Sequence, residues 1–235
     1  MSAPLQRVDL YTLVHKGLRA RLCNLLVAAG RLDHSSDAAV ALLLADLRET
    51  LALLARHAGL EDRHVHTAME RRRPGTRHAC AREHAVHRRD LEELLTLALR
   101  LEHLPALRRQ VAATELYQVL ARTVAHQLEH LALEESVNNR VLWDAFSDDE
   151  LRAIEQAMAA ELTPDEHSIF LRTLLPHVTP AERTRLLSGM RTGMPAEAFA
   201  GVLTLAARLL PGDDMRNLES ALGIERRPAD YVGLA

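Results

Sequence analysis

Histidine is the most conspicuous residue type in the first part of this 235-residue chain. The sequence contains 13 histidines, and all of them except His167 and His177 precede residue 131. Two histidines begin the same short motif, which occurs as His57-x3-Glu61 and again as His130-x3-Glu134. Residues four apart on a helix stand on one face, about 6 Å apart along the axis, so each motif can present an imidazole and a carboxylate to one point.

The helices that precede these motifs also repeat, because His15-x2-Leu18-x3-Leu22 overlays His84-x2-His87-x3-Leu91 without a gap. His15 and His84 are therefore equivalent, and the predicted ligand set has four imidazoles and two carboxylates: His15, His57, Glu61, His84, His130 and Glu134. Such a set suits two metal ions bridged by the two glutamates, with iron favoured and manganese or zinc as competitors. The alternative is a metal-free, hydrogen-bonded core, but burying these groups without a cation is costly.

The elements that must position these residues are predicted to be helices. Aromatic residues make up only 3% of the chain, and Ala, Leu, Arg and Glu, all strong helix formers, dominate it. Apolar residues spaced three and four apart predict long helices over residues 10–30, 37–69, 77–102 and 105–146, the third with Leu91, Leu94, Leu95 and Leu99 on one face. We therefore expect an all-α fold with an antiparallel four-helix bundle over residues 1–146.

Residues 147–235 show a different pattern and are expected to form a small all-helical C-terminal region. Three capping boxes begin short helices at Ser147-x2-Glu150, Thr163-x2-Glu166 and Thr179-x2-Glu182, and two further helices are predicted over 196–210 and 213–222. This region has no repeated ligand spacing and no glycine-rich phosphate loop.

At the repeated residues the chain resembles the hemerythrin-like family of cation-binding four-helix bundles. The family's repeated H…HxxxE signature reads here as His15, His57-x3-Glu61, His84 and His130-x3-Glu134, within the segments YTLVHKGLR, HAGLEDRHVHTAMERRRPG, REHAVHRRDLEEL and HLALEESVNNRVLWDAFSDDEL. The resemblance covers about residues 8–146 and implies an oxo- or hydroxo-bridged di-iron centre. Members of the family include oxygen carriers, oxygen and iron sensors, and proteins that protect against nitric oxide or repair damaged iron centres.

The chain departs from the oxygen-carrier branch of that family. That branch has HxxxH in its third segment and an aspartate in its fourth, where this chain has His84-x2-His87 and Glu134. The chain is therefore nearer the two-glutamate branch, which implies reactive or regulatory iron more than reversible oxygen carriage.

The resemblance also implies a fifth histidine ligand, for which His34 and His87 are the best candidates. His34 precedes the second helix, and His87 lies one turn after His84. His64 and His126 also fall on the predicted ligand face. His66, by contrast, lies about 180° from His57 on an ideal helix and is expected to pack elsewhere or face solvent. Asp62 and Glu135 are expected to be exposed charges.

Charge and hydropathy exclude several other classes. A formal net charge of -3 with Arg and Glu interspersed gives no basic stripe for nucleic acid. No apolar run approaches the roughly 18 to 20 residues of a membrane span, and the first 22 residues lack a hydrophobic export core. We expect a cytoplasmic protein with no membrane partner, in which Cys23 and Cys80 are reduced thiols.

Two hypotheses of function follow. The first is a redox-active di-iron protein that binds or reacts with O2, NO or peroxide in redox or nitrosative stress, together with a reductant; as an enzyme it would be an oxidoreductase. The second is an iron or oxygen sensor, or interaction module, whose metal state controls helix packing and the binding of a protein partner.

Overall fold

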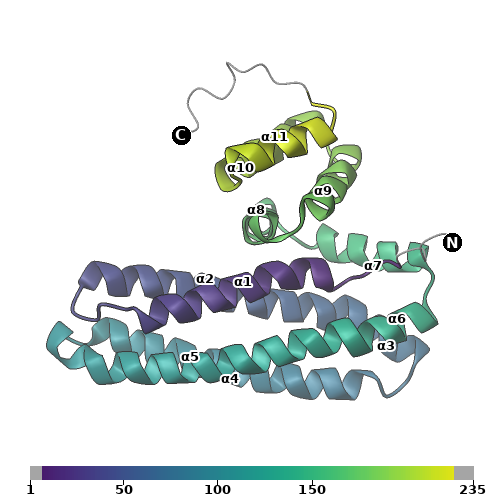
Figure 1. The fold of residues 1–235 in the computed structure, drawn as a ribbon. Coiled ribbons are helices and arrows are strands. Elements are labelled where there is room, and N and C mark those ends of the chain that lie inside the picture. Colours follow the sequence, from purple (N-terminus) through teal and green to yellow (C-terminus); the bar gives the residue numbers. More distant parts are fainter. Residues whose placement is uncertain (1–6, 225–235) are drawn as a thin grey trace. The chain divides into compact units, whose positions relative to one another are not determined.

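The computed structural model describes residues 7–224, apart from the side chains of residues 77–79, and this part of the chain is all-helical without strands (Figure 1). The all-α prediction is therefore confirmed. Two compact units divide the chain between Leu162 and Thr163.

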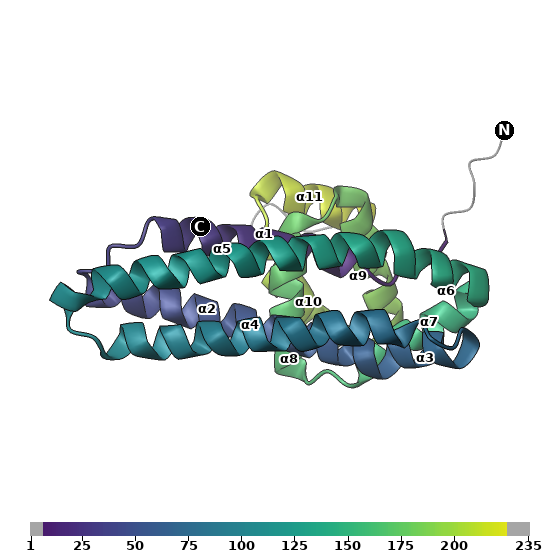
Figure 2. The same cartoon turned by 90° about the horizontal axis from the view of Figure 1, so that it is seen from below.

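Four long helices dominate the first unit: α1 (Thr12–Gly30), α2 (Asp37–Leu60), α4 (Arg77–His103) and α5 (Arg109–Leu133). Helices α1 and α4 each pack against both α2 and α5, and the two views agree that the four helices run side by side (Figures 1 and 2). Their facing sides are formed by fully buried leucines, which include Leu18, Leu25, Leu44, Leu94 and Leu120. Burying each of these side chains contributes about 1.5–3 kcal/mol relative to leaving it exposed.

Two of the long helices continue beyond a π-helical turn. Helix α2 passes through the π-helical segment Glu61–Val65 into α3 (His66–Arg72), and α5 passes through Glu134–Asn138 into α6 (Asn139–Ala145). A short 3-10 turn, Ala106–Arg108, precedes α5. The two π-helical segments begin at the two glutamates of the repeated motif, so the repeat extends from sequence to backbone geometry.

The first unit also includes α7 (Asp148–Ala160), so it ends later than the domain boundary expected after residue 146. Leu151 of α7 is fully buried in a cluster with Tyr11, Val65 and Leu142. The end of the helix is held by Glu161, which forms ion pairs with Arg63 and His64. Apolar burial therefore joins α7 to the long helices.

The apolar face of α4 differs from the predicted one. Leu91 and Leu94 are buried as expected, but Leu95 and Leu99 are 39% and 53% exposed. Leu97 and Leu101 take their places in the core. The sequence offers leucines on both sides of this helix, and the packing against α2 and α5 selects between them.

The second unit contains α8 (Pro164–Leu174), a 3-10 turn Leu175–His177, α9 (Pro180–Gly193), α10 (Ala196–Leu209) and α11 (Gly212–Ala221). All three predicted capping boxes are present, two of them at the starts of α8 and α9 and the third at α7. The helices enclose a core that includes Leu175, Leu187 and Ala206. Within residues 163–224 no group of His, Cys, Asp and Glu side chains comes close enough to hold a metal ion.

Candidate metal centre

The six residues of the repeated pattern converge inside the first unit. Helices α1 and α4 supply His15 and His84, the last turns of α2 and α5 supply His57 and His130, and the π-helical segments supply Glu61 and Glu134. All six are buried, with at most 6% of any residue exposed. They form two groups in which the donor atoms lie within 4.8 Å of one another, and both groups include the two glutamates.

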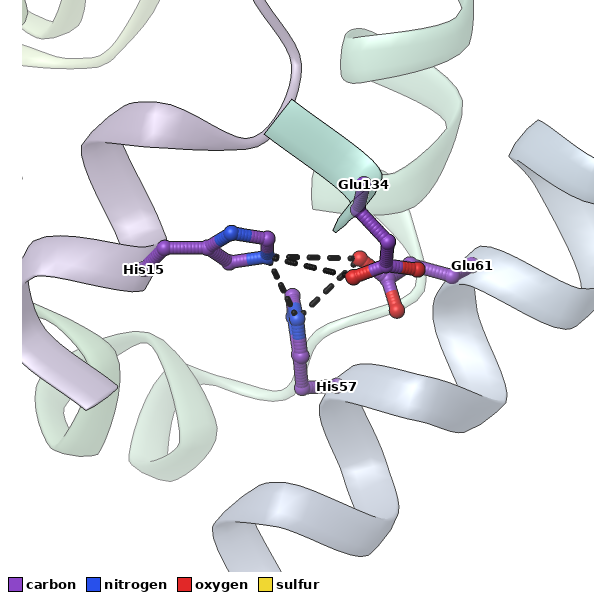
Figure 3. Close-up of side chains that lie close together, drawn as sticks. All are labelled: His15, His57, Glu61 and Glu134. Carbon is purple, nitrogen blue, oxygen red and sulfur yellow. Dashed lines mark hydrogen bonds and ion pairs between the residues drawn. The ribbon is translucent and has the colours of Figure 1, made fainter. Parts of the chain in front are cut away.

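The first group consists of His15, His57, Glu61 and Glu134, whose imidazoles point toward the two carboxylates (Figure 3). The Nε2 atoms of His15 and His57 lie 3.2 Å apart. Glu61 Oε1 lies 3.1 Å from His57 Nε2 and 3.7 Å from His15 Nε2. Glu134 Oε2 lies 3.6 Å from the same His15 nitrogen.

The second group mirrors the first with the other oxygen of each carboxylate. The Nε2 atoms of His84 and His130 lie 3.0 Å apart. Glu61 Oε2 lies 3.8 Å from His84 Nε2, and Glu134 Oε1 lies 3.4 Å from His130 Nε2. Each glutamate therefore directs one oxygen to each pair of imidazoles, which is the arrangement of a carboxylate that bridges two cations.

The donor set fits metal ions better than it fits a metal-free core. Among the described residues, no N–H or O–H makes a hydrogen bond to any of the four oxygens of Glu61 and Glu134. Buried carboxylates without such partners are strongly disfavoured unless a cation compensates them. Imidazole nitrogen and carboxylate oxygen together suit iron, manganese and zinc.

The pKa shifts of Glu61 and His15 indicate that positive charge is favoured between the two pairs of imidazoles. Burial raises the pKa of Glu61, but the facing imidazoles of His57 and His15 outweigh it, and the pKa is well below its ordinary value. Burial lowers the pKa of His15, but its contacts with Glu135 and Glu61 outweigh that effect and raise the pKa to about 9. Metal ions must displace such protons, so binding releases protons as it does at other imidazole sites.

A carboxylate holds the Nδ1 side of three of the imidazoles, and this second layer follows the repeat. Glu135 Oε1 accepts from His15 Nδ1 at 3.1 Å, and Asp62 Oδ1 accepts from His84 Nδ1 at 3.0 Å. Each carboxylate follows a glutamate of the repeated motif and orients the imidazole of the other half of the repeat. A donating Nδ1 leaves the lone pair on Nε2, which faces the glutamates, and this is how outer carboxylates usually orient metal-binding histidines.

Two arginines complete the pattern of the second layer. Arg19, four residues after His15, forms a two-pronged pair with Glu135 at 2.5 and 3.0 Å, and Arg88, four residues after His84, lies 3.7 Å from Asp62. The expectation that Asp62 and Glu135 are merely exposed charges was wrong. The signal was present in the sequence, because both follow the glutamate of a His-x3-Glu motif. His130 has a carboxylate of its own, since Glu83 Oε2 accepts from its Nδ1 at 2.7 Å.

His66 is the residue of the site that the sequence reasoning missed. It is fully buried; its Nδ1 donates to Asp62 Oδ1 at 3.2 Å, and its Nε2 lies 3.6 Å from Glu134 Oε1. Burial lowers its pKa, but Asp62, Cys80 and Glu134 outweigh burial and raise it to about 12. The prediction assumed an ideal helix, whereas the π-helical turn after Glu61 rotates His66 toward the site.

The structure does not bring the two candidates for a fifth histidine into either group. His34 lies in the loop after α1, and the helix between His15 and Gly30 alone spans about 22 Å at 1.5 Å per residue, so His34 is wrong as a ligand of this site. His87 lies closer, with its ring edge-on to His130 and the two ring centroids 4.6 Å apart, but it belongs to neither group. His64 and His126 instead form ion pairs with Glu161 and Asp90.

A small cavity of about 130 Å³ reaches the centre. Leu54 of α2, Leu91 of α4 and Leu131 of α5 line it together with the imidazoles of His57, His84 and His130. His87 and His130 line this cavity and also a more open pocket of about 370 Å³, so both rings border the two spaces. Burial, and then the neighbouring His130 and His84, lower the pKa of His87 to about 3, and the ring is therefore neutral at physiological pH.

Comparisons with protein-family models, with curated proteins and with solved structures find no match for this chain. Among the described helices, none is both long and apolar enough to cross a membrane.

Proposed function

We propose that the chain is a non-haem di-iron protein with a hemerythrin-like four-helix bundle, and that it binds or reacts with O2, NO or peroxide in redox or nitrosative stress. The observation that carries the proposal is the division of each buried glutamate between two pairs of imidazoles. Two iron ions, one at each pair, would give all four buried carboxylate oxygens a metal partner.

The chain's own residues would bind, orient and shield the ions. Bound iron supplies open coordination positions and one-electron chemistry to a small ligand. Glu135 and Asp62 keep the lone pairs of His15 and His84 directed inward, and the arginines beside them keep the carboxylates in place. Leu54 and Leu91 exclude bulk water from the approach to the centre.

The cavity favours a small ligand over an organic substrate. Its volume of about 130 Å³ is below the roughly 300–1,000 Å³ of pockets that enclose drug-sized molecules. A diatomic molecule or a peroxide fits this space without rearrangement. The neutral ring of His87 at its outer wall offers hydrogen bonding without adding charge.

Metal content per chain tests the proposal directly. We expect protein purified from iron-replete cells to contain about two irons, with near-ultraviolet oxo-to-iron absorption after exposure to oxygen, as the two donor groups require. The double variant Glu61→Gln, Glu134→Gln should lose both irons, whereas the matched control Asp90→Asn, which removes an exposed His–carboxylate pair, should keep them. Zinc or no metal in the wild-type protein would overturn the proposal.

A second candidate function is an iron or oxygen sensor whose metal state controls helix packing. One contact favours it: Arg63 and His64, which lie in the same π-helical turn as Glu61, hold Glu161 at the end of α7 at 2.8 Å each. A change in metal occupancy at Glu61 would then reach α7. Limited proteolysis decides, because a sensor predicts faster cleavage of residues 147–162 in metal-free protein, and equal cleavage in both forms would exclude this role.

A further inference from the structure

The two halves of the centre differ at the position five residues after each glutamate, which His66 occupies in the first half. Its Nε2 is buried, has no hydrogen-bond partner among the described residues, and lies 3.6 Å from Glu134 Oε1. The Nε2 atoms of His130 and His84 lie 3.4 and 3.9 Å from the same oxygen. Three imidazole nitrogens therefore surround one carboxylate oxygen, whereas the other oxygen of Glu134 faces His15 alone at ion-pair distance.

The π-helical turn brings His66 to this place. The backbone N–H of His66 donates to the carbonyl of Glu61, five residues earlier, so His66 stacks one wide turn beyond the bridging glutamate. Asp62 Oδ1 accepts from the Nδ1 atoms of both His66 and His84, at 3.2 and 3.0 Å. One carboxylate thus orients two imidazoles in the same way, and His84 already belongs to the donor set.

The other half of the repeat places a different side chain at the equivalent position. Asn139 follows Glu134 by the same five residues, and its backbone N–H closes the second π-helical turn. Asn139 is also fully buried, but its Nδ2 donates to the backbone carbonyl of Glu135 at 3.2 Å. An amide thus occupies the position where the first half has an imidazole.

We propose that His66 is a ligand of the metal ion held by His84 and His130. This inference rests on the proposed function and deepens it, because it makes the two metal positions unequal. The position of His84 and His130 would have five protein donors, and the position of His15 and His57 would have four. The open coordination position then belongs to the metal of His15 and His57. The cavity reaches His57 as well as His84 and His130.

The test uses the variant His66→Asn, which copies the residue of the other half, and the control His64→Asn, which changes an ion-paired histidine of the same turn outside the centre. Mössbauer spectra of the iron-57-loaded full chain should show two distinct quadrupole doublets of equal area in the wild type and in the control. In His66→Asn the doublets should converge. Chelator competition should show that one of the two irons is released at least about tenfold more readily, because a metal ligand is worth no less than an outer-sphere partner.

Two results would overturn the inference, and both are distinct from failure of the proposed function. A single doublet in wild-type protein that contains two irons would show that the two positions are equal, and this measurement does not depend on how the variant folds. Unchanged spectra and unchanged iron release in a folded His66→Asn protein would show that His66 is not a ligand. Wild-type protein without two irons would instead refute the di-iron proposal itself.

Discussion

Replacing Asp62 by Asn tests whether the outer carboxylates tune the metal centre. Asp62 Oδ1 accepts from the Nδ1 atoms of His84 and His66, and these contacts outweigh burial and hold its pKa well below the ordinary value, so the charge is present at neutral pH. Loss of an outer-sphere partner of a metal-bound histidine typically weakens metal binding about 10- to 100-fold, or roughly 1.4–2.7 kcal/mol. We expect Asp62→Asn to weaken the binding of one of the two metals by that amount.

Chelator competition on the metal-loaded protein measures this effect and locates it. Asp62→Asn should weaken the metal at His84, whereas Glu135→Gln, the equivalent change in the other half, should weaken the metal at His15. Each variant should therefore release one metal at a lower chelator concentration than the wild type does, and the other metal at the same concentration. The control Asp90→Asn should release both metals as the wild type does. If all three variants behave alike, the outer carboxylates do not support the centre and the reasoning fails.

Three further predictions concern pH, ligand entry and the second unit. The pKa of His15 in the folded protein is raised to about 9 from 6.5, so its charge stabilises the metal-free protein below pH 6.5. This stability, of order 3 kcal/mol, is lost as the pH rises through 9. An unfolding temperature of the metal-free protein that does not change between pH 6.5 and 9 would contradict this prediction. His87→Ala should join the cavity to the more open pocket and raise the rate of azide association in stopped-flow absorbance, and an unchanged rate would mean that ligands enter elsewhere. Thr179→Ala removes the N-terminal cap of α9 and should cost about 1 kcal/mol in denaturant unfolding of the second unit, with the metal content unchanged.

The helices of this protein could be predicted from sequence because their signals are local. Apolar spacing located the long helices, and the three capping boxes formed as written. Which face of α4 is buried could not be settled in the same way, since leucines lie on both sides and only the packing against α2 and α5 places Leu97 inside and Leu99 outside. The boundary of the first unit also depends on long-range contacts, because Leu151 is buried against Tyr11 and Val65, which lie more than 80 positions earlier in the sequence.

The site was predictable to the extent that it repeats. The six residues that converge were found by overlaying the two halves, because the repeat identifies equivalent positions without any knowledge of the helix packing. His34 was a wrong candidate since its choice depended on the resemblance to a family and not on the repeat. The length of α1 between His15 and the loop places it far from the centre.

His66 shows why the remaining part of the site could not be derived from spacing alone. On an ideal α-helix, the residue nine positions after His57 points about 180° away from it. A single π-helical turn between the two residues changes this angle. Such turns recur at functional sites, and here both begin at a glutamate of the repeated motif. The repeat makes the positions five residues after the two glutamates equivalent. His66 occupies this position in one half and Asn139 occupies it in the other. Both halves have the same π-helical turn, but the turns place different side chains at the centre. This difference would make the two metal positions of a duplicated motif unequal.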